Sequence, residues 1–221
     1  MKLLLRLFLL VWMLHNTAHI FAQQKPFYKE IQNFKKQDSI AFPPANAILF
    51  VGSSSFRKWG NVQSYFPGYK IINRGFGGST LPDVIAYFDD IITPYHPKQV
   101  VIYCSDNDLA SSDSITPMIV FKRFQQLYFL IKQKLPNANV AYISIKPSPS
   151  RERLAGRMKE ANNLIKSFLE KRKHTAFIDL YKDMILPDGK ARPDLFVEDK
   201  LHMNEKGYRI WQKAIEPYLV K

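Results

Sequence analysis

Five short apolar segments, rich in β-branched and aromatic residues, recur along the chain and predict five strands. Within each segment the apolar residues are nearly continuous and do not alternate with polar ones. Strands of that kind are buried on both faces, as in a parallel sheet that helices cover on either side. The predicted strands are Ala47–Val51, Tyr69–Asn73, Gln99–Cys104, Asn139–Ser144 and Thr175–Leu180.

The segments outside these strands carry apolar residues at helical spacing. In Leu81–Ile92, for example, the apolar positions recur every three or four residues, which places them on one side of a helix. The predicted helices are Pro26–Ile40, Leu81–Ile92, Pro117–Leu135, Ser150–Lys173 and Asn204–Leu219. Alternation of strand and helix predicts an α/β fold with a parallel, doubly wound sheet. A chain of 221 residues is long enough for one such domain and too short for two.

The first 22 residues have the three-part layout of a secretory signal peptide. Lys2 and Arg6 supply the positive start, residues 7–14 are apolar, and Ala22 suits the position before a cleavage site. The apolar run is too short to span a bilayer, and no later segment is long enough either. We therefore expect residues 1–22 to be removed, residues 23–221 to form the domain, and the product to be secreted or periplasmic.

Charge and cysteine content narrow the function classes. The formal net charge is +13, and loss of Lys2 and Arg6 lowers it to +11 (13 − 2). The basic residues are scattered or lie on helix faces, and no nucleic-acid-binding signature accompanies them, so no nucleic-acid partner is expected. Cys104 is the single cysteine, which excludes an intramolecular disulfide. Its place in an apolar run predicts a buried small hydrophobe.

Polar segments follow several predicted strands directly, and the last one precedes the last helix. They are "GSSSF" with three serines, "RGFGGST", "SDND" and "EDKLH". Ligands of a parallel sheet collect at the carboxyl ends of its strands, where these segments meet. Each segment alone has a simpler explanation as a helix cap or a turn. Together they predict a catalytic site at this edge.

These residue types match the needs of acyl transfer. One of Ser53, Ser54 and Ser55 would be the nucleophile, exposed at a helix N-terminus. His202 would take its proton, and Asp199, three residues earlier, would orient the imidazole. An α/β-hydrolase elbow is disfavoured because Phe56 stands where that motif has a glycine.

The chain resembles the SGNH (GDSL-type) hydrolase superfamily from about residue 47 to residue 211. The family's first block matches "VGSSSF" and its glycine block matches Gly78 before Ser79. The asparagine block matches Asn107 in "CSDND", and the last block, aspartate-x-x-histidine, matches Asp199 and His202. The resemblance implies a flavodoxin-like three-layer α/β/α sandwich with a five-stranded parallel sheet. It also implies ester hydrolysis without a metal or organic cofactor.

The resemblance assigns the nucleophile to Ser54, the base to His202 and the orienting acid to Asp199. It assigns the oxyanion hole to the Ser54 and Gly78 amides and the Asn107 side chain. The chain departs from the family pattern twice, at Ser53, where the family has aspartate, and at Ser105, where it has glycine. The second change bears on the backbone that positions Asn107.

The substrate expected from the sequence is a small-molecule or oligosaccharide ester with a short acyl group such as acetyl, because no long apolar lid segment is present. Two alternatives remain, a lysophospholipase or thioesterase acting on lipid acyl groups, and a non-catalytic carbohydrate-binding domain. The oligomeric state stays open, as do the roles of Arg74, Lys146 and Arg151.

Overall fold

The computed structural model describes residues 25–221, so the predicted signal peptide lies outside the described part of the chain. Five parallel strands form one sheet in the order β2-β1-β3-β4-β5. They are β1 (Ile48–Gly52), β2 (Ile71–Gly75), β3 (Gln99–Tyr103), β4 (Asn139–Ile143) and β5 (Thr175–Ile178). Because β1 pairs with both β2 and β3, the carboxyl ends of these three strands lie next to one another.

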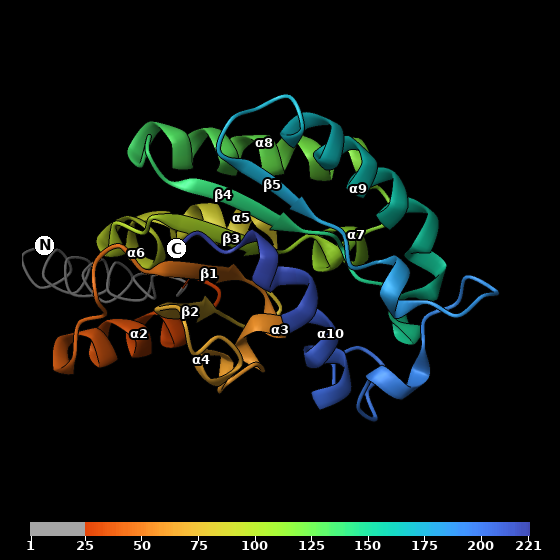
Figure 1. Ribbon diagram of the computed structural model, residues 1–221. Helices are drawn as coiled ribbons and strands as arrows, with labels where there is room; N and C mark the ends of the chain where they lie inside the picture. The colour runs from red at the N-terminus through yellow and green to blue at the C-terminus, as the bar shows by residue number, and fades with distance from the viewer. Residues whose placement is uncertain (1–24) are drawn as a thin grey trace, which may run out of the picture.

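Helices connect the strands and cover both faces of the sheet (Figure 1). The α-helices are α2 (Tyr28–Ile40), α3 (Ser54–Arg57), α4 (Val62–Tyr65), α5 (Leu81–Ala86), α6 (Phe88–Ile91), α7 (Asp106–Ser111), α8 (Pro117–Lys134), α9 (Ala155–Leu169) and α10 (Glu205–Ile215). Short 3-10 helices are η1 (Thr93–Tyr95), η2 (Pro149–Leu154), η3 (Lys182–Met184), η4 (Pro193–Leu195) and η5 (Glu216–Tyr218). Within residues 25–221, no helix is both long and apolar enough to cross a bilayer.

Alternate residues of each strand enter two separate cores. Leu49, Val51 and Ile102 face the core formed with α2, α5, α6, α8 and α9. Phe50 and Tyr103 face the core formed with α3, α4 and α10, where Trp59 and Trp211 are fully buried. Both faces of the sheet are therefore covered, which is why the strands read as continuous apolar runs. The α/β sandwich predicted from the sequence is confirmed.

Two predicted helices differ from the structure. The predicted helix 81–92 is two helices, α5 and α6, which meet at Tyr87 with a non-helical φ of −109°. The Tyr87 hydroxyl donates to the Pro26 carbonyl, 2.7 Å away, and so connects this break to the segment before α2. The predicted helix 150–173 begins as η2, because the Arg151 backbone is non-helical, and its α-helical part ends at Leu169.

Hydrogen bonds join the loops after β1, β2 and β3 around one glycine. The Gly52 carbonyl accepts from the Phe76 amide at 3.0 Å and from the Ser79 hydroxyl at 3.1 Å. The Ser53 amide donates to the Tyr103 carbonyl at 3.0 Å. Gly52 has a φ of +140°, and a Cβ there would lie 1.9 Å from the Tyr103 oxygen. Only glycine permits this close approach, which places three polar loops at one edge.

Candidate active site

Ser54 is the first residue of α3, which directly follows β1. Ser53 occupies the N-cap position in an extended conformation and makes no side-chain bond to the helix, so the simpler explanation of this segment as a serine cap is not supported. Ser53 and Ser55 are buried, whereas Ser54 is partly exposed. The Oγ atom of Ser54 lies 2.8 Å from the Nε2 atom of His202. Among the three adjacent serines, Ser54 is therefore the one whose hydroxyl contacts an imidazole.

His202 and Asp199 contact each other within one tight turn that precedes α10. The His202 Nδ1 atom lies 2.6 Å from Oδ2 of Asp199. The other carboxylate oxygen, Oδ1, accepts from the backbone amides of Leu201 at 2.9 Å and His202 at 2.8 Å. The turn needs a left-handed residue, Lys200, with a φ of 56°. These bonds fix the carboxylate against the imidazole and leave Nε2 directed at Ser54.

The electrostatics of Asp199 follow from the same bonds. Partial burial raises the pKa of its carboxyl, but hydrogen bonds from the His202 ring and from the His202 and Leu201 amides outweigh burial. The pKa consequently lies well below its ordinary value, and the group is a carboxylate at neutral pH. Lys58, not singled out in the sequence, places its Nζ atom 4.0 Å from Oδ2 of Asp199.

Asn204, two residues after His202, caps α10 as its position before the helix predicts. Its side-chain oxygen accepts from the Gly207 amide at 3.3 Å. Because Asn204 fills the N-cap, Asp199 is not needed for capping and remains bonded to His202.

Gly78 and Asn107 lie beside each other at the ends of β2 and β3. A Cβ built on Gly78 would lie 3.7 Å from Nδ2 of Asn107, and that amide nitrogen donates to the Ser79 carbonyl at 3.2 Å. Buried Asp108 holds the two loops together, since its Oδ2 accepts from the Leu81 amide at 3.0 Å. Its Oδ1 pairs with Arg123 at 2.8 Å. Burial raises the pKa of Asp108, and the bonds from Arg123 and Leu81 act in the opposite direction.

The departure from the family pattern at Ser105 falls on a strained backbone position. Ser105 has a φ of 105°, a conformation that favours glycine. Its Oγ accepts from the Tyr142 hydroxyl at 2.9 Å, and the same hydroxyl contacts the Cys104 carbonyl at 2.8 Å. The serine thus keeps the glycine-type backbone that precedes Asn107 and gains a buried side-chain partner.

Three residues singled out in the sequence, Arg74, Cys104 and Lys146, are buried and bonded within the protein. Arg74 is buried between the rings of Phe34 and Tyr95, where it pairs with Asp38 of α2. Cys104 is fully buried as predicted, and burial raises the pKa of its thiol well above its ordinary value. Lys146 is buried, and its Nζ donates at 2.8 Å to the carbonyl of Leu201, the residue directly before His202.

The sequence did not indicate that α2 contributes to the glycine loop. Glu30 accepts from the Gly77 amide at 2.9 Å, and the ring of Phe27 occupies the space that a Cβ of Gly77 would need. Phe27 also packs edge-on against Phe76, with ring centroids 5.3 Å apart. These contacts join residues about 50 positions apart, so no local pattern reveals them.

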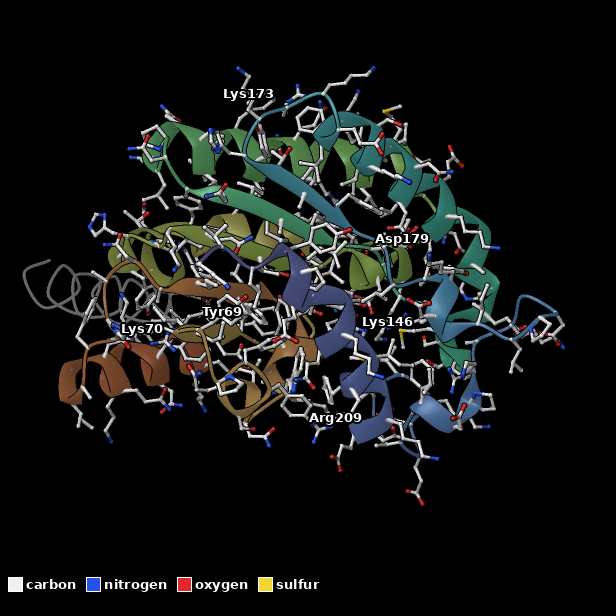
Figure 2. All side chains as sticks on the ribbon, in the orientation of Figure 1. Tyr69, Lys70, Lys146, Lys173, Asp179 and Arg209 are labelled. Atoms are coloured by element: carbon white, nitrogen blue, oxygen red, sulfur yellow. The ribbon has the colours of Figure 1, made fainter. Side chains whose placement is uncertain are left out.

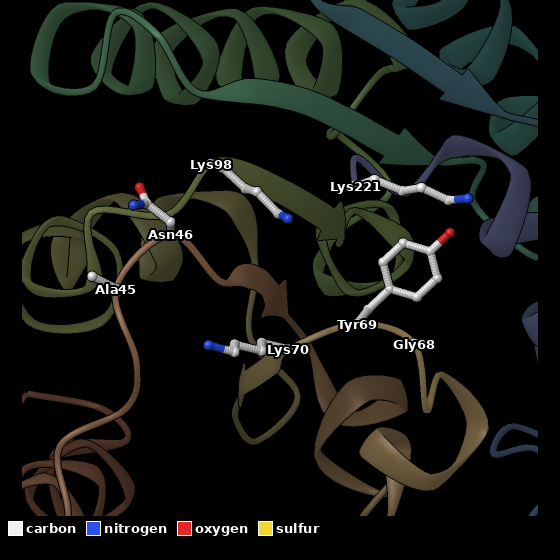
Figure 3. A pocket seen from close by; sticks show the side chains of 7 residues that line it. All are labelled: Ala45, Asn46, Gly68, Tyr69, Lys70, Lys98 and Lys221. Carbon is white, nitrogen blue, oxygen red and sulfur yellow. The ribbon is translucent and has the colours of Figure 1, made fainter.

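A basic pocket lies at the opposite edge of the sheet. Ala45, Asn46, Gly68, Tyr69, Lys70, Lys98 and Lys221 line it. Lys70 directly precedes β2 and Lys98 directly precedes β3, so the pocket is at the amino ends of the strands. Figure 3 shows the three lysine side chains pointing in different directions, not toward one common position.

The chain was compared with known protein families, curated proteins and solved structures. The model of the GDSL-like lipase/acylhydrolase family matches residues 38–210, which is most of the chain. The chain belongs to this family. It is accordingly a hydrolase that acts on esters, and the expectation of an SGNH-type enzyme is confirmed.

Solved structures with the same fold include several members of this family. A GDSL-like lipase from Bacteroides thetaiotaomicron VPI-5482 is 20% identical, with a TM-score of 0.71, over 85% of this chain and 96% of that one. A Bacteroides fragilis NCTC 9343 protein described as an acylhydrolase is 22% identical, with a TM-score of 0.74, over 85% and 94%. A mutant of an acetyl-xylooligosaccharide esterase from Geobacillus Stearmophilus is 15% identical, with a TM-score of 0.62, over 80% and 96%. A search of curated proteins found no match.

Proposed function

We propose that this GDSL-family hydrolase works through an acyl-enzyme on Ser54, with His202 as general base and Asp199 as the residue that orients it. The observation that carries the proposal is the continuous chain of contacts from Asp199 Oδ2 to His202 Nδ1 and from His202 Nε2 to Ser54 Oγ. A serine hydroxyl becomes an effective nucleophile when a positioned imidazole accepts its proton. An adjacent carboxylate keeps the imidazole in the tautomer that has Nε2 free to do so.

Each step of the reaction then has an assigned atom. Ser54 Oγ attacks the ester carbonyl carbon while His202 Nε2 takes the hydroxyl proton, which gives a tetrahedral intermediate. Collapse of the intermediate breaks the bond to the alcohol oxygen, and the His202 proton passes to that oxygen. Water then attacks the acyl-Ser54 ester and gives a proton to His202. The acid leaves as Ser54 regains that proton.

Three donors would hold the negative oxygen of each tetrahedral intermediate. They are the Ser54 amide, the Gly78 amide and the Asn107 side chain, which has a second N–H besides the one bonded to Ser79. The proximity of Gly78 to Asn107 supports this assignment. The three loops are also bonded together around Gly52, so the donors would be preorganised. Each such donor is worth about 3 kcal/mol of transition-state stabilisation.

The substrate that we propose is an ester of a short acyl group, such as acetyl on a carbohydrate. The loops after β1, β2 and β3 are short, and the segment 197–200, which contains Asp199, is exposed to solvent. The Geobacillus Stearmophilus esterase, which has the same fold, is described as acting on acetyl-xylooligosaccharides. We further propose that residues 1–22 direct the protein out of the cytoplasm and are then removed. The intact mass of the exported protein tests this, because cleavage leaves residues 23–221.

A kinetic experiment tests the proposed function. Purified protein is assayed on aryl esters with acyl chains of two to twelve carbons and on acetylated xylo-oligosaccharides, beside Ser54→Ala and His202→Ala. We expect turnover that is fastest on acetyl and absent from both variants. Preference for long chains would favour a lysophospholipase or thioesterase instead. If the wild-type protein is no faster than the variants, the alternative of a non-catalytic carbohydrate-binding domain is favoured.

A further inference from the structure

The loop after β4 brings a lysine into the protein interior beside the proposed catalytic turn. Lys146 is only 1% exposed and is among the largest fully buried side chains of the described residues. Burying an ammonium group is costly unless it finds partners, and lysine is rarely buried completely. The position of Lys146 therefore needs a reason other than hydrophobic packing.

The partner of Lys146 is a backbone carbonyl between Asp199 and His202. The Nζ atom donates to the Leu201 carbonyl at 2.8 Å and lies 5.5 Å from the centre of the Phe196 ring. In Figure 2, Lys146 lies beyond the end of β4, next to the last segments of the chain. A second bond links the same two loops, because the Ser150 amide donates to the Lys200 carbonyl at 3.1 Å. Both residues between the acid and the histidine are thus held by the β4 loop.

The β4 loop is itself bonded to α9 and to the segment that follows β5. The Ile145 amide donates to Asn162 at 2.8 Å, and Asn162 donates back to the Ile145 carbonyl at 3.1 Å. The Ser144 hydroxyl accepts from the Leu180 amide at 3.1 Å. Lys146 therefore connects the turn that carries His202 to a loop that is itself held in place next to β4 and β5.

The charge of Lys146 is compatible with this role. Burial lowers the pKa of its ammonium group, while Asp106 and Asp199 act in the opposite direction. A buried charge of this kind seldom adds net stability, since an apolar side chain of similar volume often serves as well. The presence of an amine at this position is better explained by what it positions.

We propose that Lys146 is a positioning residue, which holds the Leu201 carbonyl so that the 199–202 turn keeps His202 Nε2 against Ser54. The inference rests on the proposed function of that site, but the geometry that it assigns to Lys146 is testable separately. Lys146 touches neither the ester nor the reacting atoms, so it acts only through the turn.

Replacement by methionine removes the donor and keeps most of the length of the side chain. We expect Lys146→Met to lower kcat on an aryl acetate by about 10- to 100-fold, the effect of a displacement near 1 Å. KM should change less than about twofold, since substrate binding is not altered. Lys146→Gln, which retains an N–H donor, should lose less of kcat than Lys146→Met.

Lys132 offers a matched control far from the site. It too donates from Nζ to backbone carbonyls, those of Pro136 at 3.3 Å and Ala138 at 2.7 Å. Lys132→Met should leave kcat unchanged. Thermal midpoints of both variants show whether a lower kcat comes from unfolded protein. A kcat of Lys146→Met within twofold of wild type, or a loss that Lys132→Met shares, would overturn the proposal.

Proton NMR separates this inference from the proposed function. We expect the His202 Nδ1 proton, 2.6 Å from Asp199 in heavy-atom distance, to give a low-field resonance, which reports the turn whether or not the protein is catalytically active. We expect Lys146→Met to shift or broaden this resonance and Lys132→Met to leave it in place. If wild type is inactive but the resonance responds, the proposed function fails and the positioning role of Lys146 stands. An unchanged resonance in Lys146→Met contradicts that role.

Discussion

The Nε2 atom of His202 lies 2.8 Å from Ser54 Oγ, although the two residues are 148 positions apart in the chain. Ser54 begins the helix after β1, and His202 lies in the turn before α10, the helix that packs over the same face of the sheet. The hydroxyl of Tyr208 in α10 strengthens this connection, since it donates to the Ser55 carbonyl at 2.9 Å. The contact is thus part of the packing between α10 and α3, and its consequences are testable one residue at a time.

Ser54→Ala should abolish the acyl-enzyme. We expect kcat on an aryl acetate to fall by at least about 10³-fold, because no other exposed hydroxyl contacts His202 in the described residues. Covalent labelling by a fluorophosphonate should disappear from the intact mass. Ser53→Ala is the control, since the Ser53 hydroxyl is buried and makes no hydrogen bond within residues 25–221. Labelling that persists in Ser54→Ala and maps to Ser55 would contradict the assignment.

Asp199→Asn should lower kcat by about 10⁴-fold while the protein remains folded. An asparagine presents an amide in place of the carboxylate and favours the tautomer in which Nε2 carries the proton, so His202 no longer accepts from Ser54. Steady-state kinetics with active-site titration measure the loss. A decrease of less than about tenfold would mean that another group orients the imidazole.

Stability should depend on pH through the same carboxylate. The folded-state pKa of Asp199 lies below the value of about 3.9 in an unfolded chain, so the carboxylate contributes stability above that pH. The contribution is lost as the pH falls below about 4. Its size is at most about 1 kcal/mol, because the side chain is 42% exposed and solvent screens it. Urea unfolding at pH 6 and pH 3 should show that wild type and Asp199→Asn differ more at pH 6. A difference that is equal or larger at pH 3 would refute this linkage.

Asn107→Ala should weaken the oxyanion hole. Loss of one donor is expected to lower kcat by about 10²- to 10³-fold with little change in KM. The bond from Asn107 to the Ser79 carbonyl is also lost, so the thermal midpoint must be compared with that of wild type. Asn139→Ala, which removes a side-chain bond to the Lys98 carbonyl at the other edge of the sheet, is a suitable control. Equal kcat values for the two variants would exclude Asn107 from the oxyanion hole.

Gly52→Ala should destabilise the whole edge of the sheet. The new Cβ would meet the Tyr103 oxygen at 1.9 Å, and the φ of +140° is unfavourable for alanine. We expect the free energy of unfolding to fall by more than about 2 kcal/mol. Gly60→Ala is the matched control, because nothing lies within 4 Å of its built Cβ, and it should change stability by less than about 0.5 kcal/mol. Chemical denaturation of both variants provides the measurement.

The strands were predictable because their signal is local. The run Ala47–Val51 needs only its own apolar residues to indicate β1, which the structure places at Ile48–Gly52. The break at Tyr87 was not predictable, since the apolar spacing of residues 81–92 continues through it. That break accompanies a bond from the Tyr87 hydroxyl to Pro26, 61 residues away.

Sequence alone determined the fold class, the two buried faces of the sheet and the set of polar loops at its carboxyl edge. Apolar periodicity and the alternation of strands and helices along the chain decide these. Local spacing treats Ser53, Ser54 and Ser55 alike, so only the family resemblance pointed to Ser54, and the tertiary structure places the Ser54 hydroxyl against His202. Only the tertiary structure decided the position of Lys146, which its charge would place at the surface. Its burial depends on the Leu201 carbonyl, 55 residues further along the chain, which only folding brings within hydrogen-bonding distance.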